Sequence, residues 1–63
     1  MTRVKINAAT APIVKLALRK GYEQHDIAAY FRDNQGRVSE INTGKKYRDA
    51  PVADSLPPDF PSL

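Results

Sequence analysis

Residues 24–44 read QHDIAAYFRDNQGRVSEINTG, and this stretch contains the pattern that predicts the fold. Its first part places Ile27, Ala28 and Phe31 at the i, i+1, i+4 spacing of one helical face. The next residues, 32–34, are Arg, Asp and Asn, which continue a helix poorly and form turns well. The stretch therefore predicts a short helix followed by a tight turn.

A second short helix is expected after the turn. Val38 and Ile41 lie three residues apart and define its buried side. Asn34 is a good N-cap residue for this helix, and Gly44 stands where a left-handed residue commonly ends a helix. A small side chain at Ala28 lets the two helices cross closely, so the pattern predicts a packed helix pair.

The whole stretch resembles the helix-turn-helix signature of small bacterial and phage repressors and related DNA-binding regulators. The matching positions are Gln24 at the start and, at the buried sites, Ile27, Ala28, Phe31, Val38 and Ile41. The resemblance implies a transcriptional regulator that binds double-stranded DNA sequence-specifically through the second helix. One departure is Arg32, because the family usually has glycine there to take a positive φ. Arginine must accept the strain or shift the turn by one residue.

The predicted reading face of the second helix points away from Val38 and Ile41. The candidate base-contacting residues on and beside it are Gln35, Gly36, Arg37, Ser39, Glu40 and Thr43. The resemblance places Gln35 at the leading edge, where glutamine can bond N6 and N7 of adenine. Glycine inside a helix costs up to about 1 kcal/mol relative to alanine. Gly36 therefore indicates either a close approach of the backbone to DNA or a relaxed first turn.

Two compatible interpretations are open for Arg37. Its guanidinium can contact a guanine edge or a phosphate, and it can form an i, i+3 ion pair with Glu40 that contributes about 0.3 kcal/mol. Glu40 itself repels phosphates, although a carboxylate can accept a hydrogen bond from cytosine N4 in a specific site.

Phosphate contacts are expected on both sides of the reading face. The candidate residues are Gln24, Asn34, Lys45, Lys46 and Arg48, together with Arg3 and Lys5 near the N-terminus. Each lysine can alternatively serve only to keep a small domain soluble.

The sequence before this stretch predicts one more helix. Thr10 can cap it, Pro12 is tolerated in its first turn, and Gly21 ends it. Its apolar side consists of Ile13, Val14, Leu16, Ala17 and Leu18, whereas Lys15, Arg19 and Lys20 are expected to face solvent. The sequence therefore predicts an all-α, helix-turn-helix DNA-binding domain of three helices over residues 10–48. Residues 24–44 show the resemblance directly, and the first helix is expected to support them as a scaffold.

Residues 1–9 are expected to form an extended arm or a short strand, because polar and apolar residues alternate from Thr2 to Ile6. As a strand, Val4 and Ile6 would pair across the two-fold axis of a homodimer. As an arm, Arg3 would enter the minor groove of DNA. A homodimer is expected because one recognition helix touches few base pairs and a 63-residue domain is marginally stable alone.

Residues 49–63 are expected to form an irregular Pro-rich tail that is extended or disordered, since prolines at positions 51, 57, 58 and 61 prevent a long helix. The net charge changes sign at the boundary between residues 48 and 49. Residues 1–48 hold all ten Lys and Arg residues and four acidic residues, a balance of +6, whereas the tail carries −3. A basic domain with an acidic tail favours a polyanionic partner.

The residue inventory argues against catalysis. The chain has no cysteine and one histidine, so a disulfide framework and a four-ligand zinc site are excluded. It also has no glycine-rich phosphate loop and no carboxylate cluster spaced for two metals. We therefore expect no enzyme activity, no cofactor and no metal site. Basic residues interrupt every apolar run, so we expect a cytoplasmic protein with no membrane segment.

The residues are also compatible with two other functions. A protein-binding inhibitor or adaptor could use the same helical scaffold with the acidic tail as its contact element, and Glu40 on the presumed DNA face favours it. A cationic membrane-surface helix over residues 10–20 is a weaker alternative. Tyr47 is expected in the core, Tyr22 and Tyr30 are expected to direct their hydroxyls to solvent or phosphate, and His25 is expected on the surface.

Overall fold

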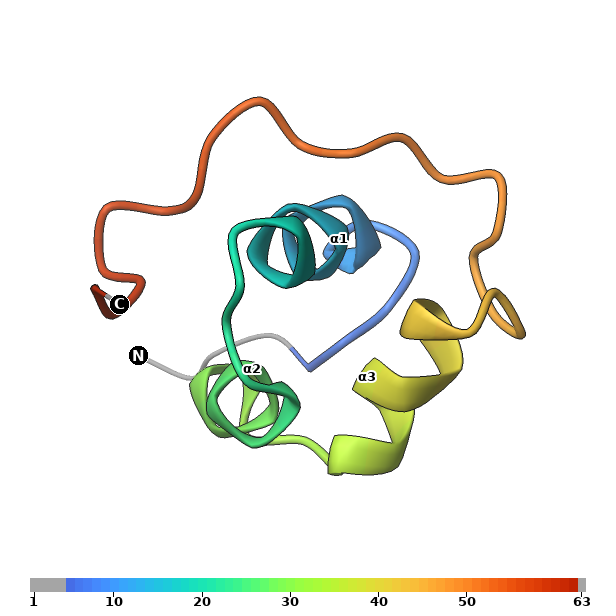
Figure 1. Cartoon of the computed structure of the whole chain (residues 1–63), viewed down its shortest axis with the longest axis horizontal. Coiled ribbons are helices and arrows are strands. Elements are labelled where there is room, and N and C mark those ends of the chain that lie inside the picture. Colours follow the sequence, from blue (N-terminus) through green and yellow to red (C-terminus); the bar gives the residue numbers. More distant parts are fainter. Residues whose placement is uncertain (1–4, 63) are drawn as a thin grey trace.

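The computed structural model describes residues 5–62, which form three helices and no strand (Figure 1). The helices are α1 (Ala11–Arg19), α2 (Gln24–Phe31) and α3 (Gln35–Asn42). The predicted all-α fold is therefore confirmed. The part of the predicted N-terminal strand from Thr2 to Val4 lies outside the described residues.

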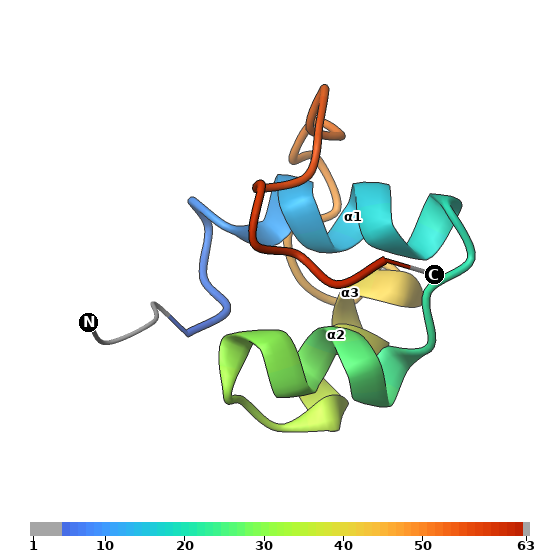
Figure 2. The ribbon, with the colours of Figure 1, turned by 90° about the vertical axis from the view of Figure 1, so that its left-hand side faces the viewer.

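The helices enclose a single small core. α2 and α3 pack against each other, and α1 lies across both of them (Figures 1 and 2). The buried residues are Ala11, Val14, Ala17, Ile27, Ala28, Phe31, Val38, Ile41 and Phe60. All five apolar positions that carry the helix-pair pattern are thus in the core. Ala28 is 4% exposed, as expected of a small residue between two crossing helices.

The turns that end the three helices share one hydrogen-bond pattern. After α1 the amide of Gly21 donates to the carbonyl of Leu18 (3.2 Å), and the amide of Tyr22 donates to that of Ala17 (3.1 Å). These two bonds define a Schellman motif, which requires a left-handed residue. Gly21 meets this need with φ +95°, and Gly44 does the same after α3 with φ +79°.

Arg32 occupies the equivalent position after α2. Its φ of 53° and ψ of 42° are left-handed. Its amide donates to the carbonyl of Ala29 (3.1 Å), and the amide of Asp33 donates to that of Ala28 (3.0 Å). Of the two outcomes expected for an arginine here, the structure has the strained backbone, and the turn is not shifted. The side chain costs stability at a position where glycine does not.

The start of α1 differs from the expectation. Thr10 stands at the N-cap position, but its side chain makes no capping hydrogen bond to the helix. Instead the Thr10 hydroxyl oxygen accepts from the amide of Asn7 (2.8 Å), while Asn7 Oδ1 accepts from the amide of Ala9 (2.8 Å). The asparagine forms a local turn before the helix, and this turn takes the hydroxyl away from the capping role.

The C-terminal segment, defined here as residues 49–62, is irregular but packed. It crosses over α1 and ends beside α2 (Figures 1 and 2). The amide of Ala53 donates to the carbonyl of Pro12 (3.1 Å), and Phe60 is only 9% exposed. The expectation of an extended or disordered tail was therefore wrong about packing, because one aromatic residue supplies enough apolar area to anchor the segment.

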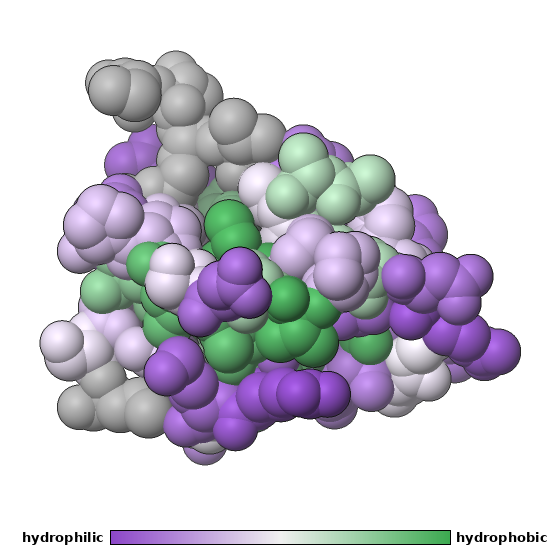
Figure 3. All heavy atoms as spheres, turned by 90° about the horizontal axis from the view of Figure 1, so that it is seen from above, coloured by the Kyte–Doolittle hydropathy of each residue, from purple (hydrophilic) through white to green (hydrophobic). Residues whose placement is uncertain are grey.

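Lys15 also differs from the expectation that it faces solvent. Its ammonium group donates to the carbonyls of Arg48 (2.9 Å) and Ala50 (2.7 Å), and its side chain is half-buried. Lys15 thereby ties the start of the C-terminal segment to α1. The face formed by this segment and α1 carries a central apolar patch edged by hydrophilic residues (Figure 3).

Candidate nucleic-acid interface

The interface begins at the N-terminus of α3, where Asn34 is the cap. Its Oδ1 accepts from the amide of Gly36 at 2.7 Å, so the predicted capping role is confirmed. A Cβ atom added at Gly36 would lie 3.1 Å from this same Oδ1. The fold therefore explains glycine at position 36, because the absence of a Cβ atom leaves room for the capping side chain of Asn34.

The predicted reading face of α3 points away from the core. Val38 and Ile41 are buried. On the other side Gln35, Gly36, Arg37 and Thr43 are exposed, and Ser39 and Glu40 are half-buried. At 100° per residue, Gly36, Ser39, Glu40 and the C-cap residue Thr43 form a strip opposite the buried side, and Gln35 and Arg37 flank this strip.

Two side chains on this strip form an ion pair. Nη1 of Arg37 donates to Oε1 of Glu40 at 3.0 Å, one helical turn away. The Arg37 side chain is 52% exposed and that of Glu40 is 34% exposed, so water screens the pair only in part. The carboxylate neutralises the guanidinium locally while leaving its other donors accessible.

The hydroxyl of Thr43 is directed back into its own helix. It donates to the carbonyl of Ser39 at 2.9 Å, a local bond that competes with outside contacts. Thr43 is exposed, as expected, but the sequence did not predict this internal use of its hydroxyl.

The basic residues after α3 lie on a short loop. Lys45 and Lys46 are exposed, and the amide of Lys45 donates to the carbonyl of Glu40 at 2.8 Å. Nε of Arg48 donates to the carbonyl of Gly44 at 3.3 Å, which leaves the guanidinium's remaining donors on an exposed side chain. Tyr47 packs against the core as expected, with a positive φ of 55°.

The N-terminal residues are attached to the turn between α2 and α3. The Lys5 ammonium donates to the carbonyl of Arg32, and the Ile6 amide donates to Oδ2 of Asp33 at 3.2 Å. Ile6 packs against the core of its own chain. Neither Lys5 nor Ile6, the described part of the predicted strand, is in a strand. Arg3 lies outside the described residues.

The carboxylate of Asp33 joins Ile6 to the turn between α2 and α3. Besides the Ile6 amide, it accepts from the amide of Asn34 at 2.7 Å. The bond from Asn34 is the main reason why the pKa of Asp33 lies below its ordinary value of 3.8. The charges of Lys5 and Arg37 act in the same direction. From the sequence, Asp33 is expected only to favour a turn, and its bond to Ile6 is not predicted.

Gln24, the remaining candidate, opens α2 and is half-buried. His25 follows on the exposed side of the same helix, as expected, and its Nε2 lies 3.4 Å from Oδ1 of Asp26. Neighbouring residues on a helix were not expected to meet, but these two side chains bend toward each other at the surface.

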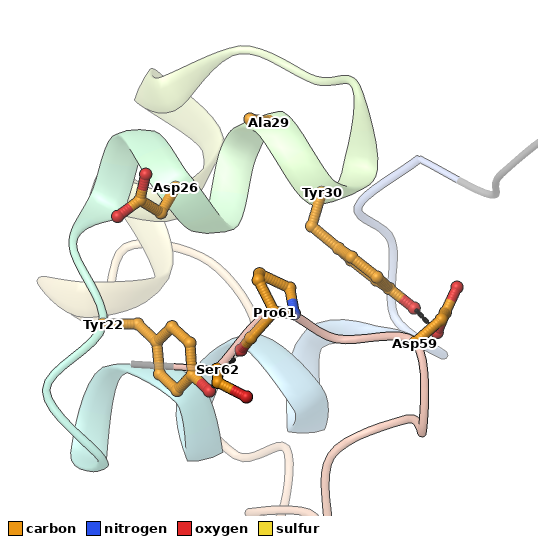
Figure 4. A pocket seen from close by; sticks show the side chains of 7 residues that line it. All are labelled: Tyr22, Asp26, Ala29, Tyr30, Asp59, Pro61 and Ser62. Atoms are coloured by element: carbon orange, nitrogen blue, oxygen red, sulfur yellow. Dashed lines mark hydrogen bonds between the residues drawn. The ribbon is translucent and has the colours of Figure 1, made fainter.

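A groove of about 490 Å³ lies between α2 and the end of the C-terminal segment. Its lining includes Tyr22, Tyr30, Asp59 and Pro61 (Figure 4). The Tyr22 hydroxyl donates to the carbonyl of Pro61 (2.6 Å), and the Tyr30 hydroxyl donates to Oδ1 of Asp59 (2.6 Å). The two rings pack against the core as expected, and their hydroxyls lie at the surface, where both bond the C-terminal segment.

Other types of site find no support among residues 5–62. These residues contain no group of three or more His, Asp or Glu side chains placed to hold a metal ion. None of their helices is long and apolar enough to cross a membrane. Comparison of the chain with models of known families, with curated proteins and with solved structures finds no match.

Proposed function

We propose that this chain binds double-stranded DNA sequence-specifically and regulates transcription, with α2, the turn at residues 32–34 and α3 acting as a helix-turn-helix. The main observation in support of the proposal is that α3 has one buried apolar side and one polar side. Val38 and Ile41 anchor one side of the helix in the core, and the opposite side presents a strip of polar side chains. A helix held this way can enter a groove without loss of its own packing.

The dimensions of α3 suit the major groove. The helix has eight residues, and an α-helix with its side chains is about 10 to 12 Å in diameter. The major groove is about 12 Å wide and displays a different pattern of donors and acceptors for each base pair. Side chains along the strip offer both kinds of group, including the amide of Gln35 and the charged groups of Arg37 and Glu40.

The basic loop after α3 would supply affinity rather than sequence choice. Lys45 and Lys46 are exposed beside the C-terminal end of the reading face. Contacts from such residues to phosphates release counterions, which makes binding depend on salt. Lys5 and Lys15 contribute charge, but their ammonium groups already bond backbone carbonyls of this chain.

A fluorescence anisotropy titration tests the proposal. The labelled probes are duplexes enriched from a random pool and scrambled duplexes of equal composition, each measured from low to moderate salt. We expect the enriched duplexes to bind more tightly, and the logarithm of affinity to fall with the logarithm of salt by roughly 0.9 per phosphate contact. Absence of binding to any duplex at low salt by folded protein would overturn the proposal.

The two features that favoured a protein-binding adaptor have other roles in the structure. Glu40 on the reading face is paired with Arg37. The acidic C-terminal segment packs on its own domain through Phe60. DNA binding is therefore the function that we propose, with a repressor as one form of regulator.

We further propose that two copies bind one operator, because one short helix touches few base pairs. The expected half-sites are about 34 Å apart, one turn of the duplex. Light scattering of the protein, free and on an enriched duplex, measures the copy number; one copy in both cases would contradict the dimer.

A further inference from the structure

We infer that Arg37 and Glu40 act as one unit that reads a single G·C base pair in the major groove. The inference rests on the proposed DNA-binding function and names the base pair that the reading face selects. It goes beyond assigning the two residues separately, because the ion pair between them determines what each can still bind.

The geometry leaves both partners able to bind further groups. The bond from Nη1 to Oε1, 3.0 Å long, uses one of the five N–H donors of the Arg37 guanidinium. The other donors remain, and more than half of the side chain is exposed. Glu40 retains acceptor capacity on its carboxylate. The unit therefore presents donors next to an acceptor on the same strip of α3.

Donors next to an acceptor match the major-groove edge of a G·C pair better than that of an A·T pair. In the major groove a G·C pair presents two acceptors, O6 and N7 of guanine, beside one donor, N4 of cytosine. An A·T pair presents N7, the N6 donor and the O4 acceptor in alternation. Donors from Arg37 complement the guanine edge, while the carboxylate of Glu40 complements the cytosine amino group.

The charge of the unit argues against a phosphate as its target. The carboxylate offsets the positive charge of Arg37 and repels phosphate oxygens. Lys45, Lys46 and Arg48 are exposed cations on the following loop, and the ion pairs found among residues 5–62 do not include them. The pair also restricts the arginine before DNA arrives, which reduces the conformational entropy lost on binding.

The experiment compares the parent with Arg37→Lys and Glu40→Gln. The first variant keeps the charge but loses the planar fork, and the second keeps the shape of the side chain but loses the charge. Duplexes enriched by the parent from a random pool are resynthesised with A·T in place of each G·C pair in turn. At one position we expect the parent to lose roughly 5- to 150-fold in affinity. Most of this loss should disappear in either variant.

Glu40→Gln also provides a second measurement, the affinity for scrambled duplexes, which should change in the opposite direction to the G·C preference. Removal of a negative charge from the DNA face should raise affinity for scrambled duplexes while the preference for G·C falls. Replacement of the selected guanine by 7-deazaguanine, which lacks N7, should weaken binding of the parent more than that of Arg37→Lys. Lys46→Ala is the matched control, because it should weaken all duplexes and leave the G·C preference unchanged.

The outcomes separate this inference from the proposed function. If enriched duplexes bind but no G·C position depends on Arg37 and Glu40, the inference is wrong and the DNA-binding proposal stands. If the folded parent, checked by circular dichroism, binds no duplex at low salt, both are wrong. A uniform loss of affinity in Glu40→Gln, with the G·C preference intact, also overturns the inference.

Discussion

The ring of Phe60 lies 4.4 Å from the ring of Tyr30, at an interplanar angle of 42°. Phe60 also contacts Tyr22 edge to face, with ring centroids 5.0 Å apart. Aromatic pairs of this kind contribute beyond their buried area. A residue three positions from the end of the chain thus belongs to the core, and the C-terminal segment belongs to the domain.

Phe60→Ala should therefore destabilise the whole domain. Loss of a core phenylalanine costs about 3 to 5 kcal/mol, which is comparable to the entire stability of a domain this small. A urea or thermal denaturation followed by circular dichroism measures the change. Ser55→Ala in the same segment is exposed and should melt like the parent. A parent-like melt of Phe60→Ala would show that the segment does not pack as described.

Arg32→Gly should stabilise the protein. The left-handed backbone at Arg32 costs a side-chain-bearing residue roughly 1 to 2 kcal/mol, and the greater freedom of glycine in the unfolded chain offsets part of the gain. A net gain of about 1 kcal/mol corresponds to a rise in Tm of about 4 to 8 °C. The control is Arg19→Gly, which places the same substitution in right-handed helix and should lower Tm. A fall in Tm for Arg32→Gly would contradict the account of this turn.

Asp33→Asn should alter the pH dependence of stability. The pKa of Asp33 is lowered in the folded state, so its ionised carboxylate stabilises the fold fully above the unfolded value of about 3.8. This contribution is lost as pH falls through the folded pKa. The difference in unfolding free energy between parent and variant should be constant near neutral pH and shrink below pH 3.8. Asp54→Asn, in the C-terminal segment, is the control, and an unchanged difference at acid pH would contradict the role of Asp33.

Lys46→Ala and Gln35→Ala should affect DNA binding in different ways. If Lys46 contacts phosphate, its loss weakens all duplexes about equally and reduces the salt slope by about 1. If Gln35 contacts adenine, its loss removes the preference at one or two base pairs, worth about 1 to 3 kcal/mol. Titrations against duplexes with single substitutions distinguish the two effects. Equal losses for both variants would remove Gln35 from the reading face.

Much of α2 and α3 was predictable because its signals are local. The spacing of Ile27, Ala28 and Phe31 repeats with the helical period, and all three are buried. The cap at Asn34 and the stop at Gly44 depend on backbone preferences within one turn. The polar strip of α3 opposite Val38 follows from the same helical period. The position of the candidate site on α3 is therefore predictable from the sequence.

The sequence by itself determined where the helices begin and end and which side of each is apolar, since those properties arise from residues a few positions apart. Only the tertiary structure decided that Phe60 completes the core, that Lys15 bonds the backbone 33 and 35 residues away, and that Asp33 holds Ile6. Contacts between distant residues leave no periodic trace in the sequence. They form only when the packed helices bring residues 5–6 and 49–62 against them.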